Sequence, residues 1–167
     1  RTFFGGFRQV DVQRDSSAPG VTLTIGGGTL SFSLNDSAQG SAVVTWRLDP
    51  ARAGAGQGVD LTQDGSTKFR IGVRSFDYAF RKPIVVKVTI FDARDGTFQT
   101  GSSSQLELAT EVVPGTSGPS TVLEFPFASF APFGTSPASF SHVGAISITV
   151  NSVAIASDLR LASITTD

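Results

Sequence analysis

The sequence predicts an all-β protein, a two-sheet antiparallel β-sandwich with about ten strands. Apolar residues alternate with polar ones in short runs, and clusters of Gly, Pro, Asn and Asp separate these runs. No stretch of a dozen residues keeps the 3.6-residue period of a helix. Charged residues make up only 16% of the chain, against a usual share of about 25%, so long solvated helical faces are scarce.

The predicted strands follow one another from the N-terminus to the C-terminus, each rich in β-branched or aromatic residues. They are residues 8–13, 21–25, 29–34, 42–47, 68–74, 84–91, 98–100, 105–112, 121–127, 143–150 and 159–164. Small and polar residues predict surface loops at 50–58, 102–104 and 114–120. A chain of 167 residues is long enough for a sizeable core, and no repeat or boundary divides it, so we expect one domain over residues 1–167.

The strand at residues 84–90 shows the alternation most clearly. Its even positions, from Ile84 to Ile90, are branched aliphatic, and Lys87 and Thr89 lie on the other face. Turn-forming Asp and Gly residues follow at 92–96, and Thr97 then starts a return strand. This order predicts an antiparallel hairpin.

Composition and charge bear on the partners and on the location of the protein. The net charge is −1 and no run of Lys or Arg forms a basic stripe, which argues against nucleic acid as a partner. No segment approaches the ~20 apolar residues that a membrane span needs. The chain begins at Arg1 and has no Met, so we expect a processed, exported protein that is secreted or on the cell surface.

Eight short motifs together carry a resemblance to a known family. They are Gly5-Gly-Phe-Arg8, Gly28-Thr-Leu-Ser-Phe32, Val43-Val-Thr-Trp46, Val59-Asp-Leu-Thr62, Val86-Lys-Val-Thr-Ile-Phe-Asp92, Leu123-Glu-Phe-Pro-Phe-Ala-Ser-Phe130, Phe140-Ser-His-Val-Gly-Ala-Ile146 and Asp158-Leu-Arg-Leu161. Over nearly its whole length the chain resembles the exported bacterial jelly-roll domains found in PEP-CTERM-sorted proteins, and it is similar to galactose-binding-like carbohydrate-binding modules. The resemblance implies an extracellular or cell-surface β-sandwich, although the Pro-Glu-Pro tail is lacking.

The sequence offers little machinery for catalysis. His142 is the one histidine, and a Ser-His-Asp arrangement would need a third group to orient it. The nearest pair of carboxylates, Asp92 and Asp95, falls where the hairpin needs turn-forming residues. We therefore expect a protein that is not an enzyme.

Two binding interpretations stay open. In the first, which we take as the leading hypothesis, the protein is a structural or adhesive module of the extracellular matrix that self-associates through Phe-rich surfaces. Its assembly residues would be Phe3, Phe4, Phe7, Phe130 and Phe133, which are hard to place in one core.

In the alternative, the chain is a carbohydrate-binding module that recognises a surface polysaccharide with aromatic and polar side chains. The candidates are Phe76, Tyr78 and Arg81 in a loop-like segment at 75–83, together with Trp46. Trp46 shares a face with Val44 and Leu48, so a place in the core competes with a role as a sugar platform.

We expect no cofactor for chemistry, but a structural calcium ion is a further alternative. Jelly-roll modules that this chain resembles often hold one near the sheet edge, and the candidate ligands here are Asp11, Asp60 and Asp158. The segment from Asp92 fails the calcium-loop pattern because its twelfth position is Ser103 and not Glu.

Overall fold

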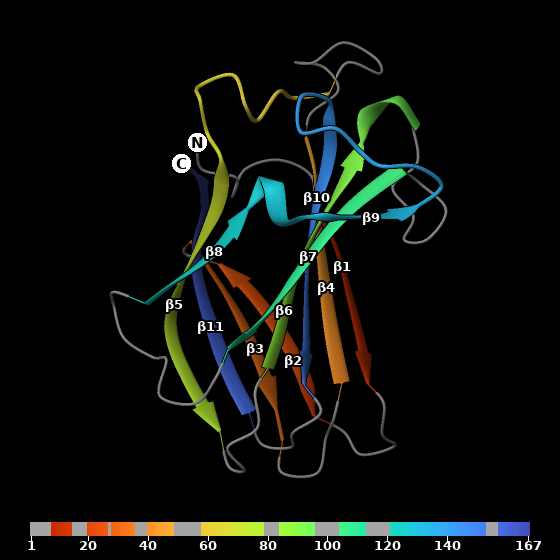
Figure 1. Ribbon diagram of the computed structural model, residues 1–167. Coiled ribbons are helices and arrows are strands. Elements are labelled where there is room, and N and C mark those ends of the chain that lie inside the picture. Colours follow the sequence, from red (N-terminus) through yellow and green to blue (C-terminus); the bar gives the residue numbers. More distant parts are fainter. Residues whose placement is uncertain are drawn as a thin grey trace.

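The computed structural model describes residues 8–14, 20–26, 28–35, 40–48, 58–78, 84–95, 104–112, 121–152 and 157–167. These residues form eleven strands and two short 3-10 helices (Figure 1). The strands are β1 (Arg8–Arg14), β2 (Val21–Gly26), β3 (Thr29–Leu34), β4 (Gly40–Arg47), β5 (Lys68–Tyr78), β6 (Ile84–Asp92), β7 (Ser104–Val112), β8 (Thr121–Pro126), β9 (Ala131–Gly134), β10 (Val143–Ser152) and β11 (Ser157–Thr166). The helices are η1 (Ala93–Asp95) and η2 (Phe127–Ser129). No helix among these residues is long and apolar enough to span a membrane.

The strands build two antiparallel sheets that pack face to face, as the alternation predicts (Figure 1). The six-stranded sheet has the order β1-β4-β10-β6-β7-β9, and the five-stranded sheet has the order β2-β3-β11-β5-β8. The predicted pairing after β6 is confirmed, because β6 and β7 pair antiparallel from Ile84 with Val112 to Phe91 with Gln105. The return strand is described from Ser104 onward, so its predicted start at Thr97 lies outside the described residues.

The core lies between the inner faces of the two sheets. In the six-stranded sheet, Val44 and Trp46 of β4 stand beside Ile148 and Ile146 of β10, and all four side chains are buried. Leu159 and Leu161 of β11 and alternate residues of β3 and β5 cover them from the five-stranded sheet. Burial of this apolar surface, at about 25 cal/mol per Å², is the main force that holds the sheets together.

Part of the Phe-rich stretch closes one side of this core. The rings of Phe127 and Phe140 stack with centroids 4.0 Å apart, and Phe69 meets Phe127 edge-on at 5.1 Å. Phe130 meets Phe140 edge-on at 5.3 Å and is buried. The cluster forms where η2 lies between β8 of one sheet and β9 of the other (Figure 1). Phe130 is therefore part of the core, which corrects its assignment to an assembly surface.

The strands differ from the prediction in two further places. Residues Ser75–Tyr78 belong to β5 and are not a loop, because β11 continues to pair with them as far as Ser157 with Tyr78. The short strand β9 was not predicted, since Ala-Pro-Phe-Gly shows no alternation and contains a proline. Proline is tolerated there because β9 lies at the edge of its sheet. The predicted strand at 98–100 lies outside the described residues.

Candidate functional site

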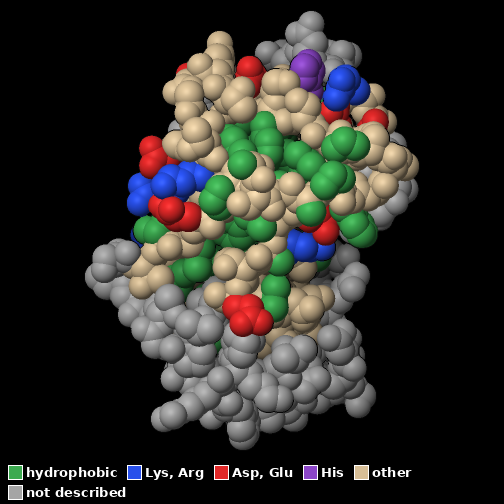
Figure 2. Space-filling model, in the orientation of Figure 1, with side chains coloured by type: hydrophobic (Ala, Val, Ile, Leu, Met, Phe, Trp, Pro, Cys, Tyr) green, Lys and Arg blue, Asp and Glu red, His purple; other side chains and the backbone are tan. Residues whose placement is uncertain are grey.

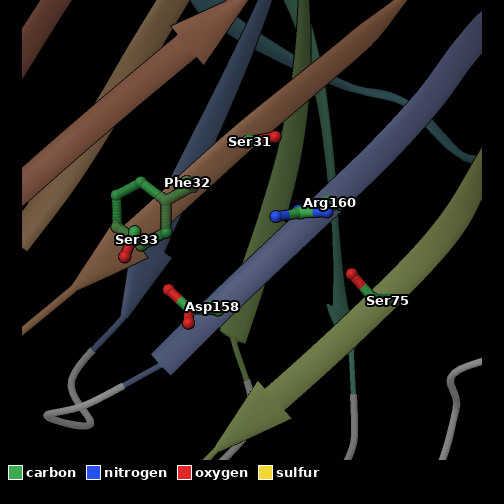
Figure 3. Close-up of a pocket in the computed structure, with 6 residues that line it drawn as sticks. All are labelled: Ser31, Phe32, Ser33, Ser75, Asp158 and Arg160. Carbon is green, nitrogen blue, oxygen red and sulfur yellow. The ribbon is translucent and has the colours of Figure 1, made fainter.

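A groove of about 370 Å³ lies on the outer face of the five-stranded sheet. Its polar lining comes from three neighbouring strands: Ser31 and Ser33 of β3, Asp158 and Arg160 of β11, and Ser75 of β5 (Figure 3). Phe32, which also borders the groove, is buried in the core. We call this surface the serine-lined groove.

The groove follows from the alternation of β3. Leu30, Phe32 and Leu34 point into the core, so Ser31 and Ser33 between them must lie on the outer face. Serine is one of the smallest side chains that still carries a hydroxyl. Because these side chains are short, the outer surface of β3 is low at this place, and it forms one side of the groove.

The middle strand of the groove, β11, carries the charged groups. Leu159 and Leu161 are buried, and Asp158 and Arg160 are exposed on the outer face. The register sets Arg160 beside Ser31 on one flank and Ser75 on the other, and it sets Asp158 beside Ser33. Arg160 therefore stands between two short, hydroxyl-bearing neighbours, whereas Asp158 has Ser33 on one flank and Asp77 on the other.

A β-bulge adds a further cation at this place. Arg160 pairs with Ser75, but the next residue, Leu161, pairs with Val73, so Arg74 is an extra residue in β5. Arg74 is exposed, whereas Val73 and Phe76 on either side of the bulge are buried. Bulges commonly re-aim a side chain in this way, and here the bulge leaves both Arg74 and Ser75 on the solvent side.

A second irregularity in the same strand pair brings the backbones close together. The pairing moves from Leu161 with Val73 to Ile164 with Ile71, and Gly72 lies between these partners. A Cβ atom on Gly72 would come to 3.0 Å from the Cβ of Ala162. Glycine therefore allows β11 to pack closely against β5 next to the groove.

The charged groups of the groove have no partner among the described residues. Neither Asp158 nor Arg160 makes an ion pair or a side-chain hydrogen bond there, and the same holds for Arg74. Other charges on this sheet are paired: the Nζ atom of Lys68 lies 2.9 Å from Glu124 Oε1. In the view of Figure 2, the blue side chains lie close to red ones, and a few red side chains stand apart. The groove thus offers a carboxylate and guanidinium groups that are free to bind a polar ligand.

The sugar-binding residues predicted from the sequence do not come together at this groove. Trp46 is only 1% exposed and Phe76 only 5%, so both rings belong to the core and neither can offer its face to a ligand. Tyr78 ends β5, but its side chain lies outside the description, as does Arg81 altogether. The burial of Trp46 agrees with the core interpretation that its alternation favoured.

The predicted assembly residues differ in how far they are exposed. Phe130 is buried, as described above, whereas Phe133 on β9 is 45% exposed. Phe3, Phe4 and Phe7 lie outside the described residues. Of the two predicted assembly residues that the structure describes, Phe130 and Phe133, only Phe133 is exposed enough to contact another molecule.

The candidate calcium ligands are not gathered in one place. Asp60 precedes β5 close to the start of β10, where Val59 pairs with Val143, and its Oδ1 atom accepts hydrogen bonds from the N–H and hydroxyl groups of Thr62 at 2.8 and 2.7 Å. Asp158 follows the far end of β10. Asp11 lies on β1, and its side chain is outside the description. In the described part of the chain, no three Asp, Glu, His or Cys residues form a group that could hold a metal ion.

Asp92 and Asp95 have structural partners. Asp92 is buried and accepts hydrogen bonds from Arg94 Nε at 2.7 Å, from Arg94 Nη2 at 2.6 Å and from the Ser139 N–H group at 3.2 Å. Burial raises the pKa of Asp92, but the hydrogen bonds and the charge of Arg94 outweigh it and hold the pKa below its usual value. The carboxylate of Asp95 accepts the N–H group of Ser104. Both residues hold connecting segments in place, which agrees with their interpretation as turn residues.

His142 takes part in a chain of hydroxyl groups. Its Nδ1 atom lies 2.7 Å from Ser141 Oγ, which in turn lies 2.7 Å from Ser139 Oγ. Among the described residues, no carboxylate forms a hydrogen bond with the imidazole ring. The third member that a catalytic triad needs is therefore not seen in this part of the chain.

The groove itself was missed by sequence reasoning. Ser31, Ser33 and Ser75 look like ordinary solvent-facing positions, and only Asp158 had been singled out, as a metal ligand. The available signal was the alternation of serine with leucine or phenylalanine in residues 29–34, which marks an outer face with unusually small side chains.

Comparisons with known proteins identify the fold. No protein-family model matches the sequence, and a search of curated proteins finds no match. The structure is similar to the family 11 carbohydrate-binding module from Clostridium thermocellum in complex with a beta-1,3-1,4-mixed-linked tetrasaccharide, with a TM-score of 0.51 and 12% sequence identity over 97% of this chain and 91% of that chain. It is also similar to a solution structure of CtCBM11, with a TM-score of 0.51 and 12% identity over 98% and 91% of the two chains. At this identity the likeness shows the fold, and it confirms the predicted jelly-roll-like β-sandwich.

Proposed function

We propose that this chain is a non-catalytic module that binds a polysaccharide in the serine-lined groove. The observation that carries the proposal is the pair of exposed charged side chains, Asp158 and Arg160, which line a groove together with three serines and have no partner among the described residues. On a face that only needed solubility, groups of opposite charge would be expected to pair as they do elsewhere on this sheet.

The chemistry of the groove suits a ligand rich in hydroxyl groups. A serine hydroxyl can both donate and accept a hydrogen bond, a carboxylate accepts several, and a guanidinium group donates up to five. Hydrogen bonds that involve a charged partner are the stronger ones. Because Asp158 and Arg160 make no bonds within the described protein, a sugar would not have to break any in order to bind.

The fold supports the same function. A module with this fold, at a TM-score of 0.51, is described in complex with a mixed-linked tetrasaccharide. The proposal follows the alternative that the sequence suggested, but it places the site on polar residues of β3, β5 and β11 in place of Trp46 and Phe76. It also suits the expected export of the chain, since polysaccharides of walls and matrices lie outside the cell.

The proposal is tested with variants in which larger side chains fill the groove. Ser31→Leu and Ser75→Leu each put a branched side chain at a half-buried position of the lining. Thr149→Leu is the matched control, because Thr149 is also half-buried but lies on β10 of the six-stranded sheet and does not line the groove. Affinity gel electrophoresis against soluble plant, algal and bacterial polysaccharides measures binding, and thermal unfolding verifies that each variant is folded.

We expect the wild-type protein and the control to be retarded by at least one polysaccharide, and both groove variants to lose at least tenfold in affinity, or about 1.4 kcal/mol. If no polysaccharide binds the wild-type protein, the proposed function is wrong. If binding survives in both folded groove variants, the protein binds sugar elsewhere and the assignment of the groove is wrong.

A further inference from the structure

The cations with described side chains fall into two groups. Most of them have a carboxylate partner: Lys68 with Glu124 at 2.9 Å, Arg70 with Asp167 at 3.2 Å, Lys87 with Glu107 at 3.0 Å and Arg94 with Asp92 at 2.6 Å. Arg74 and Arg160 have no ion pair among the described residues. Both therefore keep their full positive charge available to another molecule.

These two arginines lie at the same place in the fold. Arg160 pairs across the sheet with Ser75, and Arg74 is the extra residue of the bulge directly before Ser75. Both side chains are exposed. A bulge costs ladder hydrogen bonds and is kept where it re-aims a side chain, and its effect here is to put a second guanidinium group next to the groove.

The carboxylate of the groove lies at its other end. Asp158 precedes Arg160 by two residues on β11, a spacing of about 6.6 Å along a strand. It stands between Ser33 and Asp77, whereas Arg160 stands between Ser31 and Ser75. The groove is therefore polarised, with a cationic end at the bulge and an acidic end toward the start of β11.

We propose that the ligand is an acidic polysaccharide whose carboxylate or sulfate groups are held by Arg160 and Arg74. This inference rests on the proposed function, because it concerns the same groove. A guanidinium group presents a planar fork that matches the oxygens of a carboxylate or sulfate and holds them with charge-assisted hydrogen bonds. Asp158 and Ser33 then accept and donate hydrogen bonds with the hydroxyl groups of the neighbouring sugar.

The test compares polysaccharides that differ mainly in charge. Polygalacturonate is paired with its methyl ester, and carrageenan is paired with agarose, so that carboxylate and sulfate are each tested against a neutral counterpart. Binding of the wild-type protein, Arg160→Gln, Arg74→Gln and Asp158→Asn is measured by isothermal titration calorimetry in about 0.05 and 0.5 M NaCl. Lys68→Gln is the matched control, since it removes one positive charge from a paired residue outside the groove.

We expect one of the acidic polysaccharides to bind and its neutral counterpart to bind at least tenfold more weakly. Arg160→Gln should lose about tenfold or more in affinity for the acidic ligand and Arg74→Gln several-fold, while Lys68→Gln stays within about twofold. Asp158→Asn removes a like charge but also one acceptor oxygen for a sugar hydroxyl, so its affinity for the acidic ligand should fall less than that of Arg160→Gln. High salt should weaken binding of the acidic ligand, because the distance over which exposed charges attract one another falls from about 10 Å at 0.1 M salt to about 3 Å at 1 M.

The results separate the two proposals. Preference for a neutral polysaccharide, with loss of binding in the groove-filled variants but no effect of Arg160→Gln, would overturn the acidic ligand and leave the proposed function standing. Binding of acidic polymers that Lys68→Gln weakens as much as Arg160→Gln would show only a general attraction of charge, and would overturn the assignment to the two arginines. A failure of every polysaccharide to bind would overturn both proposals.

Discussion

The outer face of the six-stranded sheet and the serine-lined groove of the five-stranded sheet use polar side chains in opposite ways. On the six-stranded sheet these side chains bind one another: Glu107 Oε1 accepts hydrogen bonds from Lys87 Nζ at 3.0 Å and Thr89 Oγ1 at 3.1 Å, and the hydroxyls of Thr45 and Ser147 lie 3.0 Å apart. On the five-stranded sheet, Asp158 and Arg160 stand in a groove without such partners among the described residues.

This difference distinguishes polar residues that stabilise the fold from polar residues that are available to a ligand. The sequence alone does not distinguish them, because both kinds are simply polar residues on a strand. A polar group that is satisfied within the protein stabilises the fold, and binding a ligand there would mean breaking existing bonds. A group that is exposed and unpaired adds little to stability and is available to a ligand. Three carboxylates, Asp92, Glu107 and Asp158, span this range from buried and paired to exposed and unpaired.

The largest expected effect is at Asp92, at the end of β6 in the six-stranded sheet. Asp92→Asn removes the charge that Arg94 and the Ser139 N–H group contact, and it sets an amide donor against their donors. We expect a loss of about 2 kcal/mol in the free energy of unfolding. Urea denaturation at constant m-value measures it. A loss below about 0.5 kcal/mol would contradict the structural role of this carboxylate.

The same residue predicts how stability depends on pH. The pKa of Asp92 is lower in the folded protein than in the unfolded chain, so its contribution is complete above the unfolded value of about 3.9 and is lost as the pH falls through the folded value. The difference in stability between the wild-type protein and Asp92→Asn should be constant from about pH 5 to 7 and shrink below about pH 4. Thermal unfolding across this range is the measurement, and a difference that widens in acid would refute the explanation.

Glu107 should have an intermediate effect. Glu107→Gln takes the charge from Lys87 and weakens the bond to Thr89, and both partners lie on the same half-buried face. We expect a loss of about 1 kcal/mol in the free energy of unfolding. Glu111→Gln is the control, since Glu111 is exposed on the same strand and should change stability by less than about 0.5 kcal/mol. Equal losses in both variants would mean that the bonds of Glu107 with Lys87 and Thr89 add nothing specific to the stability of the fold.

Asp158 should have the smallest effect on stability. Asp158→Asn alters an exposed side chain with no described partner, so the free energy of unfolding should stay within about 0.5 kcal/mol of the wild-type value. A loss as large as that of Asp92→Asn would show that this carboxylate is structural. The contrast between the paired polar residues of the six-stranded sheet and the unpaired ones of the groove would then be wrong.

Most of the strands could be predicted because their information is local. In β3 and β6 the alternation of apolar and polar residues defines an inner and an outer face without reference to any other segment. The strand β9 could not be predicted in this way, because an edge strand of four exposed residues has no buried face to mark it. The excess of Phe was also misleading, since Phe130 and Phe140 pack inside the molecule through contacts that no sequence period reveals.

The candidate site could not be predicted because its information is not local. Residues 31, 75 and 158–160 are far apart in the sequence, and they meet only because β11 lies between β3 and β5. The position of Arg74 depends on a bulge, which shifts the register by one residue and leaves no signature in the sequence. In the sequence alone, a serine that lines a groove cannot be distinguished from a serine that faces open solvent, because the distinction depends on the order of the strands in the sheet.

The central claim is that the five-stranded sheet, and not the six-stranded one, presents its outer face to a polysaccharide. Titration of the ¹⁵N-labelled protein with an oligosaccharide of the bound polymer, followed by backbone amide chemical shifts, tests this directly. We predict that the largest shifts fall on Ser31, Ser33, Ser75 and Asp158–Arg160, with little change at Thr45, Thr89 and Glu107. Shifts concentrated on the latter three, with the groove unchanged, would contradict the account.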